Sequence, residues 1–96
     1  MTVDVRHNEA RHRFEASVDG GVAHCDYQRR GNVLRLHHTE VPPEAEGRGV
    51  ASALGKAALA YARETGARIE PACSYVRDYV RRHPEAHDLL AEAREP

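Results

Sequence analysis

The sequence predicts an α+β fold, in which an antiparallel four-stranded meander is followed by a βαβ unit and C-terminal helices. The first observation is a change of period: apolar residues alternate with polar ones over residues 1–40, and recur mainly at helical spacing after that. The second is length, because 96 residues is about the usual size of one domain. We therefore expect residues 1–96 to form a single domain.

Four alternating runs predict the strands of the meander. Turns at residues 19–21 and 30–32 contain glycine, which accepts the positive φ that hairpin turns need. Pro42 and Pro43 end the fourth run, because neither can donate a ladder hydrogen bond. Short connections imply antiparallel neighbours. The inward positions of the first three runs are Val3, Val5 and His7; Phe14, Ala16 and Val18; Ala23, Cys25 and Tyr27; the fourth run covers 33–41.

The remainder of the chain predicts a crossover helix, a short strand and two further helices. Gly66 is a suitable C-cap for the first helix, and a strand around Ile69, limited by Pro71, completes a right-handed βαβ unit. Ser74 can cap a short helix and Pro84 fits the start of a last one. The expected inward residues are Val50, Leu54, Ala58, Tyr61 and Ala62 in the first helix, and Leu89, Leu90 and Ala93 in the last.

Composition and charge exclude several classes of function. Fourteen Lys and Arg against fifteen Asp and Glu give a net charge of -1, which argues against a nucleic-acid binder. No apolar run approaches the roughly 18 residues of a membrane span, and no secretory signal is visible. The two cysteines, Cys25 and Cys73, do not have the spacing of metal ligands, and the seven histidines do not have it either. We therefore expect a cytoplasmic monomer without a metal, nucleic-acid or membrane partner.

The most informative segment is the loop that leads from the fourth run into the first helix, residues 41–51. Free backbone N–H groups and the helix dipole at such an N-terminus suit a phosphate or diphosphate. Gly47 and Gly49 let the backbone approach a ligand, and Arg48 could add a charge-assisted contact. Neither the P-loop pattern nor the dinucleotide-binding GxGxxG pattern fits. A tight connection without a ligand explains the two glycines equally well.

Three segments resemble the small GCN5-related N-acetyltransferases (GNATs) of the YjdJ type: residues 38–44, 47–54 and 73–76. The resemblance extends over residues 6–90 and implies a GNAT-like fold that uses acetyl-coenzyme A (acetyl-CoA) to acetylate an amine. In that family the loop carries the motif Q/R-x-x-G-x-G/A, whose backbone amides bind the diphosphate of the coenzyme. Here the motif falls on Glu44, Gly47 and Gly49. Glu44 departs from Gln or Arg, and this leaves the backbone cradle intact.

The resemblance also implies where the rest of the ligands bind. Pantetheine would lie beside the end of the fourth strand, against Thr39, Glu40 and Val41. Larger relatives have two helices that shape the acceptor pocket, where this chain has only residues 8–11, so the acceptor site should be shallow and open. The acceptor amine is not identified. The expected diphosphate cradle consists of Glu46, Gly47, Arg48, Gly49, Val50 and Ala51.

Acetyl transfer to an amine needs a group that accepts the proton of the amine. His38 is the candidate, since imidazole changes charge near neutral pH and the residue sits beside the proposed thioester channel. The alternative is a partly buried histidine on the face of Leu34 and Leu36. His37 would point to the opposite face and is the weaker candidate.

Two further side chains could take part in the transfer. Cys73 resembles the subfamily cysteine close to the acetyl group, and a thiol at a helix N-terminus gains thiolate character. It either carries the acetyl group or only lines the pocket. Tyr79, before Tyr75, is the candidate that protonates the leaving thiolate, although both have the spacing of a packed helix face. A small basic patch could reach the 3′-phosphate of the coenzyme, or is solvated surface: Arg77, Arg81, Arg82 and His83. The alternative function is a non-catalytic acetyl-CoA or CoA-binding module.

Overall fold

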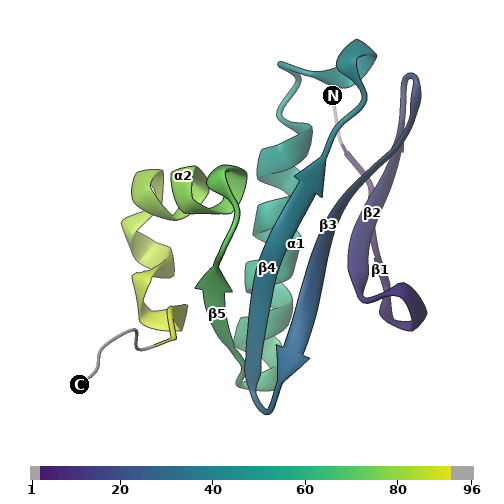
Figure 1. Cartoon of the computed structure of the whole chain (residues 1–96). Coiled ribbons are helices and arrows are strands. Elements are labelled where there is room, and N and C mark those ends of the chain that lie inside the picture. The colour runs from purple at the N-terminus through teal and green to yellow at the C-terminus, as the bar shows by residue number, and fades with distance from the viewer. Residues whose placement is uncertain (1–2, 92–96) are drawn as a thin grey trace.

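The computed structural model describes residues 3–91, which form a five-stranded sheet in the order β1-β2-β3-β4-β5 (Figure 1). The first four strands are antiparallel neighbours, and β5 pairs with β4 in parallel. The α+β fold predicted from the sequence is confirmed. The strands are β1 Val5–Asn8, β2 Arg13–Val18, β3 Gly21–Arg30, β4 Val33–Glu40 and β5 Arg68–Pro71, and the helices are α1 Val50–Thr65 and α2 Ser74–Arg82, with 3-10 turns at Glu9–Arg11, Pro43–Ala45 and Pro84–Leu89.

The helices pack on one face of the sheet, which we call the core face. Helix α1 runs behind β3 and β4 in Figure 1, and Val76 and Val80 bring α2 into the same core. All residues of the opposite face are at least partly exposed, so we call it the open face. The buried core-face residues of the strands are Phe14, Ala16, Ala23, Cys25, Tyr27, Leu34, Leu36, Thr39 and Ile69.

A β-bulge near the end of β4 changes which residues face the core. Tyr27 pairs with Leu36 but Asp26 pairs with His38, so His37 is an extra residue without a partner in β3. Because side chains alternate along a strand, one extra residue reverses the alternation. His38 therefore lies on the open face, with its side chain 53% exposed. The alternative prediction, which placed His38 on the face of Leu34 and Leu36, is wrong.

The pairing of β4 with β5 stops before β4 ends. The last ladder contact is the N–H of Ala72, which donates to the carbonyl oxygen of Leu36 at 2.9 Å. Strand β4 continues to Glu40, whereas the segment that follows β5 turns into α2. Residues 37–40 therefore have no neighbouring strand on the β5 side, at the strand end where the family resemblance places pantetheine.

The C-terminal end differs from the sequence prediction in two details. Cys73, not Ser74, is the N-cap of α2, and no side chain caps it. The segment after Pro84 is a 3-10 turn rather than a helix, because the chain leaves it at Leu90 to form a parallel bridge with Ile69. Leu89 is buried as predicted and Leu90 is partly buried. Ala93 lies outside the described residues.

Candidate functional site

A hollow of about 380 Å³ lies between the N-terminus of α1 and the facing side of α2. It contains most of the loop residues that the sequence singled out. Three residues line it from α2: Tyr75 and Arg82, which the sequence named as candidates near the coenzyme, and Asp78, which it did not. The lining residues that the sequence predicted are Val41, Glu46, Gly47, Gly49, Val50 and Ala51.

The two loop glycines have a backbone conformation that other residues rarely adopt. Gly47 has a φ of +81° and Gly49 a φ of +78°. A Cβ built on either would meet no atom within 4 Å. Contacts within the protein therefore do not require glycine at these two positions, whereas the positive φ angles favour it. The free space leaves room for a ligand against the backbone. This arrangement favours a ligand cradle over a closely packed connector.

The N-terminus of α1 is open to the same hollow. Its N-cap is Gly49, no side chain caps it, and its first turn contains no acidic residue. The first hydrogen bond into the helix joins the N–H of Ala53 to the carbonyl oxygen of Gly49 at 3.0 Å. The preceding N–H groups have no acceptor in the helix, and the positive end of the helix dipole adds to their attraction for an anion. A phosphate or diphosphate fits this end of the hollow.

Arg48 points away from the hollow. Its Nη1 lies 2.9 Å from Oδ2 of Asp19 in the β2–β3 hairpin, and it lines a separate hollow there. Glu44 also reaches this hairpin, because a Cβ on Gly20 would collide with its carboxylate. Arg48 therefore does not line the hollow in which the sequence predicted that it would contact a phosphate. Both side chains instead fix the loop against the hairpin, a tertiary contact that sequence spacing does not reveal.

Thr39 lies between the two cysteines on the core face. It is Cys25's cross-strand partner, and its Oγ1 lies 3.2 Å from Sγ of Cys73. Cys25 is fully buried, and this burial raises the pKa of its thiol to about 12. Cys73 is only partly buried. Cys73 is thus the accessible thiol at the end of β4, and Cys25 belongs to the core.

We expect iodoacetamide at pH 8 to modify Cys73 in the native protein and to leave Cys25 unmodified. With its pKa raised to about 12, Cys25 is almost entirely in the unreactive thiol form at that pH, and it is out of reach of the reagent. Peptide mass spectrometry measures both sites. Unfolding in urea should expose both thiols, and native Cys25 labelled as fast as Cys73 would contradict the prediction.

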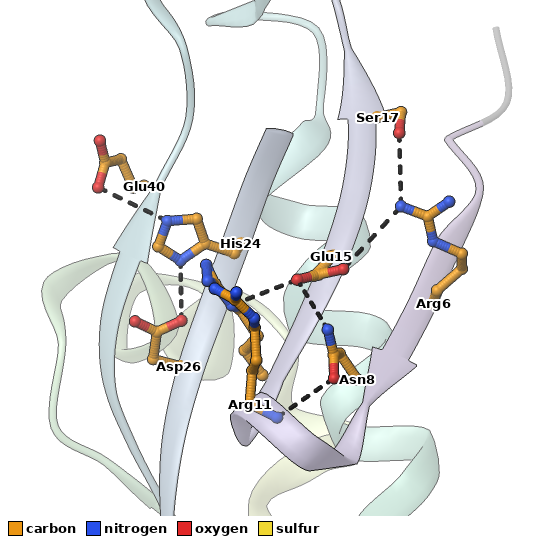
Figure 2. Close-up of polar contacts among 9 residues, drawn as sticks. Arg6, Asn8, Arg11, Glu15, Ser17, His24, Asp26 and Glu40 are labelled. Carbon is orange, nitrogen blue, oxygen red and sulfur yellow. Dashed lines mark hydrogen bonds and ion pairs between the residues drawn. The ribbon is translucent and has the colours of Figure 1, made fainter. Parts of the chain in front are cut away.

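His38 and Glu40 lie on the open face and not in the hollow. Nε2 of His38 is 3.3 Å from Oε1 of Glu40, and the same oxygen is 3.6 Å from Nε2 of His24. Nδ1 of His24 lies 2.8 Å from Oδ1 of Asp26, and Figure 2 shows this row from Asp26 to Glu40. Sequence reasoning missed His24 and Asp26, because only the strand register reveals that they face His38 and Glu40.

Tyr75 and Tyr79 have different surroundings. The Tyr79 ring stacks on His83 with centroids 3.9 Å apart and lies against Gly55 of α1, and burial raises its pKa. It lines another hollow, whereas Tyr75 is 45% exposed and lines the one at the α1 N-terminus. Of the two tyrosines only Tyr75 therefore borders the hollow at the α1 N-terminus, because one helical turn along α2 carries Tyr79 to Gly55 of α1.

Residues 3–91 have neither a metal-ligand grouping nor a membrane-spanning helix. No three His, Cys, Asp or Glu side chains are grouped there as a metal ion would require. None of the helices in that range is long and apolar enough to cross a membrane.

Comparisons with known proteins agree with one another. A family model described as GCN5-related N-acetyl-transferase matches residues 13–89. Protein NATD1 of Gallus gallus and that of Mus musculus are each 33% identical over 86 residues, covering 85% of this chain and 77% of the relative. The NMR solution structure of a GCN5-like protein from Staphylococcus aureus has a TM-score of 0.73 at 24% identity. The structural match covers 96% of this chain and 91% of the Staphylococcus aureus protein, and it shows that the two share a fold.

Proposed function

Because the chain belongs to the GCN5-related N-acetyltransferase family, we propose that it transfers an acetyl group from acetyl-CoA to an amine. The observation that carries the proposal is the hollow at the N-terminus of α1. There an uncapped helix end meets Gly47 and Gly49, whose φ angles are positive and whose Cβ positions are free. Acetyl-CoA would supply the activated acetyl group as a thioester.

The backbone of residues 47–51 would hold the diphosphate through its N–H groups. Arg82 lines the hollow from α2 and is 3.0 Å from Asp78, so a phosphate would compete with Asp78 for its guanidinium. Glu46 also lines the hollow, and its carboxylate would have to turn towards solvent. The backbone of Thr39, Glu40 and Val41 would bind pantetheine, because this end of β4 has no β5 partner.

The transfer requires several proton movements besides the exchange of bonds. An ammonium must first lose one proton, and then the C–N bond forms while the C–S bond of the thioester breaks. The nitrogen loses a second proton, and the coenzyme leaves as a thiolate that takes one up. We assign acceptance of the second of these protons, which the nitrogen loses after the C–N bond has formed, to His38, since it lies exposed at the end of β4. Tyr75 is the tyrosine we assign to the thiolate, since it lies exposed in the first turn of α2, two residues after Cys73.

Calorimetric titration with CoA and with acetyl-CoA tests the cradle, and release of free thiol with a panel of amines tests the transfer. We expect binding of both ligands and thiol release that depends on the amine. No detectable binding at millimolar ligand would end the proposal. Binding without thiol release for any amine would instead identify a non-catalytic CoA-binding module.

Cys73→Ser is expected to leave the affinity for CoA within about twofold of wild type, because the cradle consists of backbone amides. Intact-protein mass spectrometry after incubation with acetyl-CoA then tests whether Cys73 carries the acetyl group. Cys25→Ala is the matched control, since Cys25 is buried. If the wild type and the Cys73→Ser variant become acetylated to the same extent, Cys73 only lines the pocket. A large loss of CoA affinity would contradict the backbone cradle.

A further inference from the structure

Four polar side chains meet on the open face beside the bulge of β4. They come from two neighbouring strands, and each residue of β3 is the cross-strand partner of one in β4. Figure 2 shows that the two carboxylates of the row lie on either side of the His24 ring. We call these residues the histidine–carboxylate cluster: His24, Asp26, His38 and Glu40.

The histidine–carboxylate cluster has more hydrogen-bond acceptors than donors. Oδ1 of Asp26 lies 2.8 Å from Nδ1 of His24, and Oε1 of Glu40 lies 3.6 Å from its Nε2. A neutral imidazole has one N–H, and a carboxylate accepts only. With a neutral ring, one nitrogen of His24 faces an oxygen without a proton between them. Nε2 of His38, 3.3 Å from the same Glu40 oxygen, adds one more potential acceptor.

Neither carboxylate of the cluster forms an ion pair with an arginine or lysine of residues 3–91, since Arg13, the cross-strand partner of Asp26, pairs with Glu15 instead. The neighbouring carboxylate on β2, Glu15, has Arg13 at 3.3 Å, Arg6 at 4.0 Å and the amide of Asn8 at 3.2 Å. Figure 2 shows Arg6 and Asn8 beside it. Among the ion pairs of residues 3–91, none joins Asp26 or Glu40 to an arginine or lysine. Two carboxylates with only histidine partners attract a cation that can donate hydrogen bonds.

We propose that the histidine–carboxylate cluster binds the acceptor substrate as a primary alkylammonium and removes its proton. The three N–H bonds of an ammonium match the acceptors on Glu40, His24 and His38. The proton would pass from the ammonium nitrogen to Nε2 of His24, leaving a neutral amine and an imidazolium between Asp26 and Glu40. This inference rests on the proposed acetyl transfer, and it adds the class of the acceptor and the roles of His24 and Asp26.

The position of the cluster relative to Cys73 supports this assignment. Thr39 lies between His38 and Glu40 in the chain, and its side chain points to the opposite face of the sheet, where it contacts Cys73. The cluster and Cys73 therefore lie on two sides of a strand end that has no β5 partner. No described helix covers the open face, so an amine on a flexible chain has access, whether it belongs to a small alkylamine or to a lysine side chain.

Steady-state kinetics of His24→Gln and Asp26→Asn test the inference, with butylamine and with a lysine-containing peptide as acceptors. We expect kcat/KM for the acceptor to fall about 10- to 100-fold, since general base catalysis is typically worth at least that much. The affinity for CoA should remain within about twofold, because the diphosphate cradle lies elsewhere. Glu70→Gln is the control: this carboxylate is on the open face but pairs with Arg35. Acetylation of the peptide alone would identify protein lysine as the source of the ammonium.

The loss in His24→Gln should be greatest at low pH, where more of the acceptor is protonated. Two further charged residues lie near His24 on β2: Glu15, which is the cross-strand partner of His24, and Arg13, which is the cross-strand partner of Asp26. Both are unchanged in the variant. If the wild type is active and His24→Gln changes kcat/KM by less than about twofold, the inference is overturned and the proposed function stays intact. The same holds if Glu70→Gln lowers kcat/KM as much as His24→Gln does.

A binding measurement without acetyl-CoA keeps the two proposals separable. We expect butylammonium to shift the NMR signals of the His24 and His38 rings, and tetramethylammonium, which has the same charge but no N–H, to leave them unshifted. Equal shifts with both cations, or none with butylammonium, would contradict the ammonium site. A wild type that neither binds CoA nor releases thiol would refute the proposed function, and the titration would still decide on the ammonium site.

Discussion

Gly47→Val is expected to weaken CoA binding by about 30- to 100-fold. The φ of +81° at Gly47 is one that a β-branched residue adopts only with strain, about 1 to 2 kcal/mol for a left-handed conformation. The free space at its Cβ position is where we propose that the diphosphate lies. Displacing a phosphate oxygen from a backbone N–H removes a charge-assisted bond worth about 1.5 to 3 kcal/mol. Each 1.4 kcal/mol corresponds to about a tenfold change in Kd.

Gly31→Val provides a matched control for this variant. Gly31 has a φ of +61° and free space at its Cβ position, but it lies in the β3–β4 turn, away from the hollow. Both variants should therefore lose some stability in thermal unfolding, and only Gly47→Val should lose CoA affinity in calorimetry. Equal affinities of the two variants would mean that the loop is only a connector.

Leu54→Ala is expected to lower the free energy of unfolding by about 3 kcal/mol. Leu54 is fully buried on α1, the helix whose N-terminus borders the proposed cradle. Truncating such a side chain removes its burial and leaves a cavity, which together cost about 2 to 5 kcal/mol. For a chain of this size the loss corresponds to a decrease of Tm by roughly 10 to 20 °C.

Lys56→Ala is the control for Leu54→Ala, because Lys56 is exposed on the same helix. Lysine and alanine have similar helix propensities, so the control should change the free energy of unfolding by less than about 0.5 kcal/mol. Urea denaturation followed by circular dichroism measures both variants. A loss below about 1 kcal/mol in Leu54→Ala would show that the core relaxes around the missing side chain.

The site could be predicted from the sequence only where local signals define it. Gly47 and Gly49 directly before a periodic helix indicate a helix N-terminus with an exposed backbone, and both line the hollow. Arg48, between them, was predicted to contact the ligand but pairs with Asp19. A guanidinium at the end of a long side chain can reach many partners, and its choice depends on a hairpin 29 residues away in the chain.

The end of β4 marks the limit of alternation as evidence. A period of two predicts the strand, but it does not reveal that His37 is an extra residue in the ladder. That single bulge places His38 and Glu40 beside His24 and turns Thr39 towards Cys73. Tyr75 and Tyr79 are similar: their spacing puts both on one stripe of α2, while the packing of α2 on α1 decides which one borders the hollow.

The sequence by itself determined the order of strands and helices, the connections between them and the helix end that borders the hollow. These depend on local properties: the period of apolar residues, the fixed φ of proline and the positive φ of glycine. Only the tertiary structure decided the strand register and the partners of Arg48, Tyr79 and His24. Those depend on contacts between residues far apart in the chain, where a shift of one position moves a side chain to the other face of the sheet.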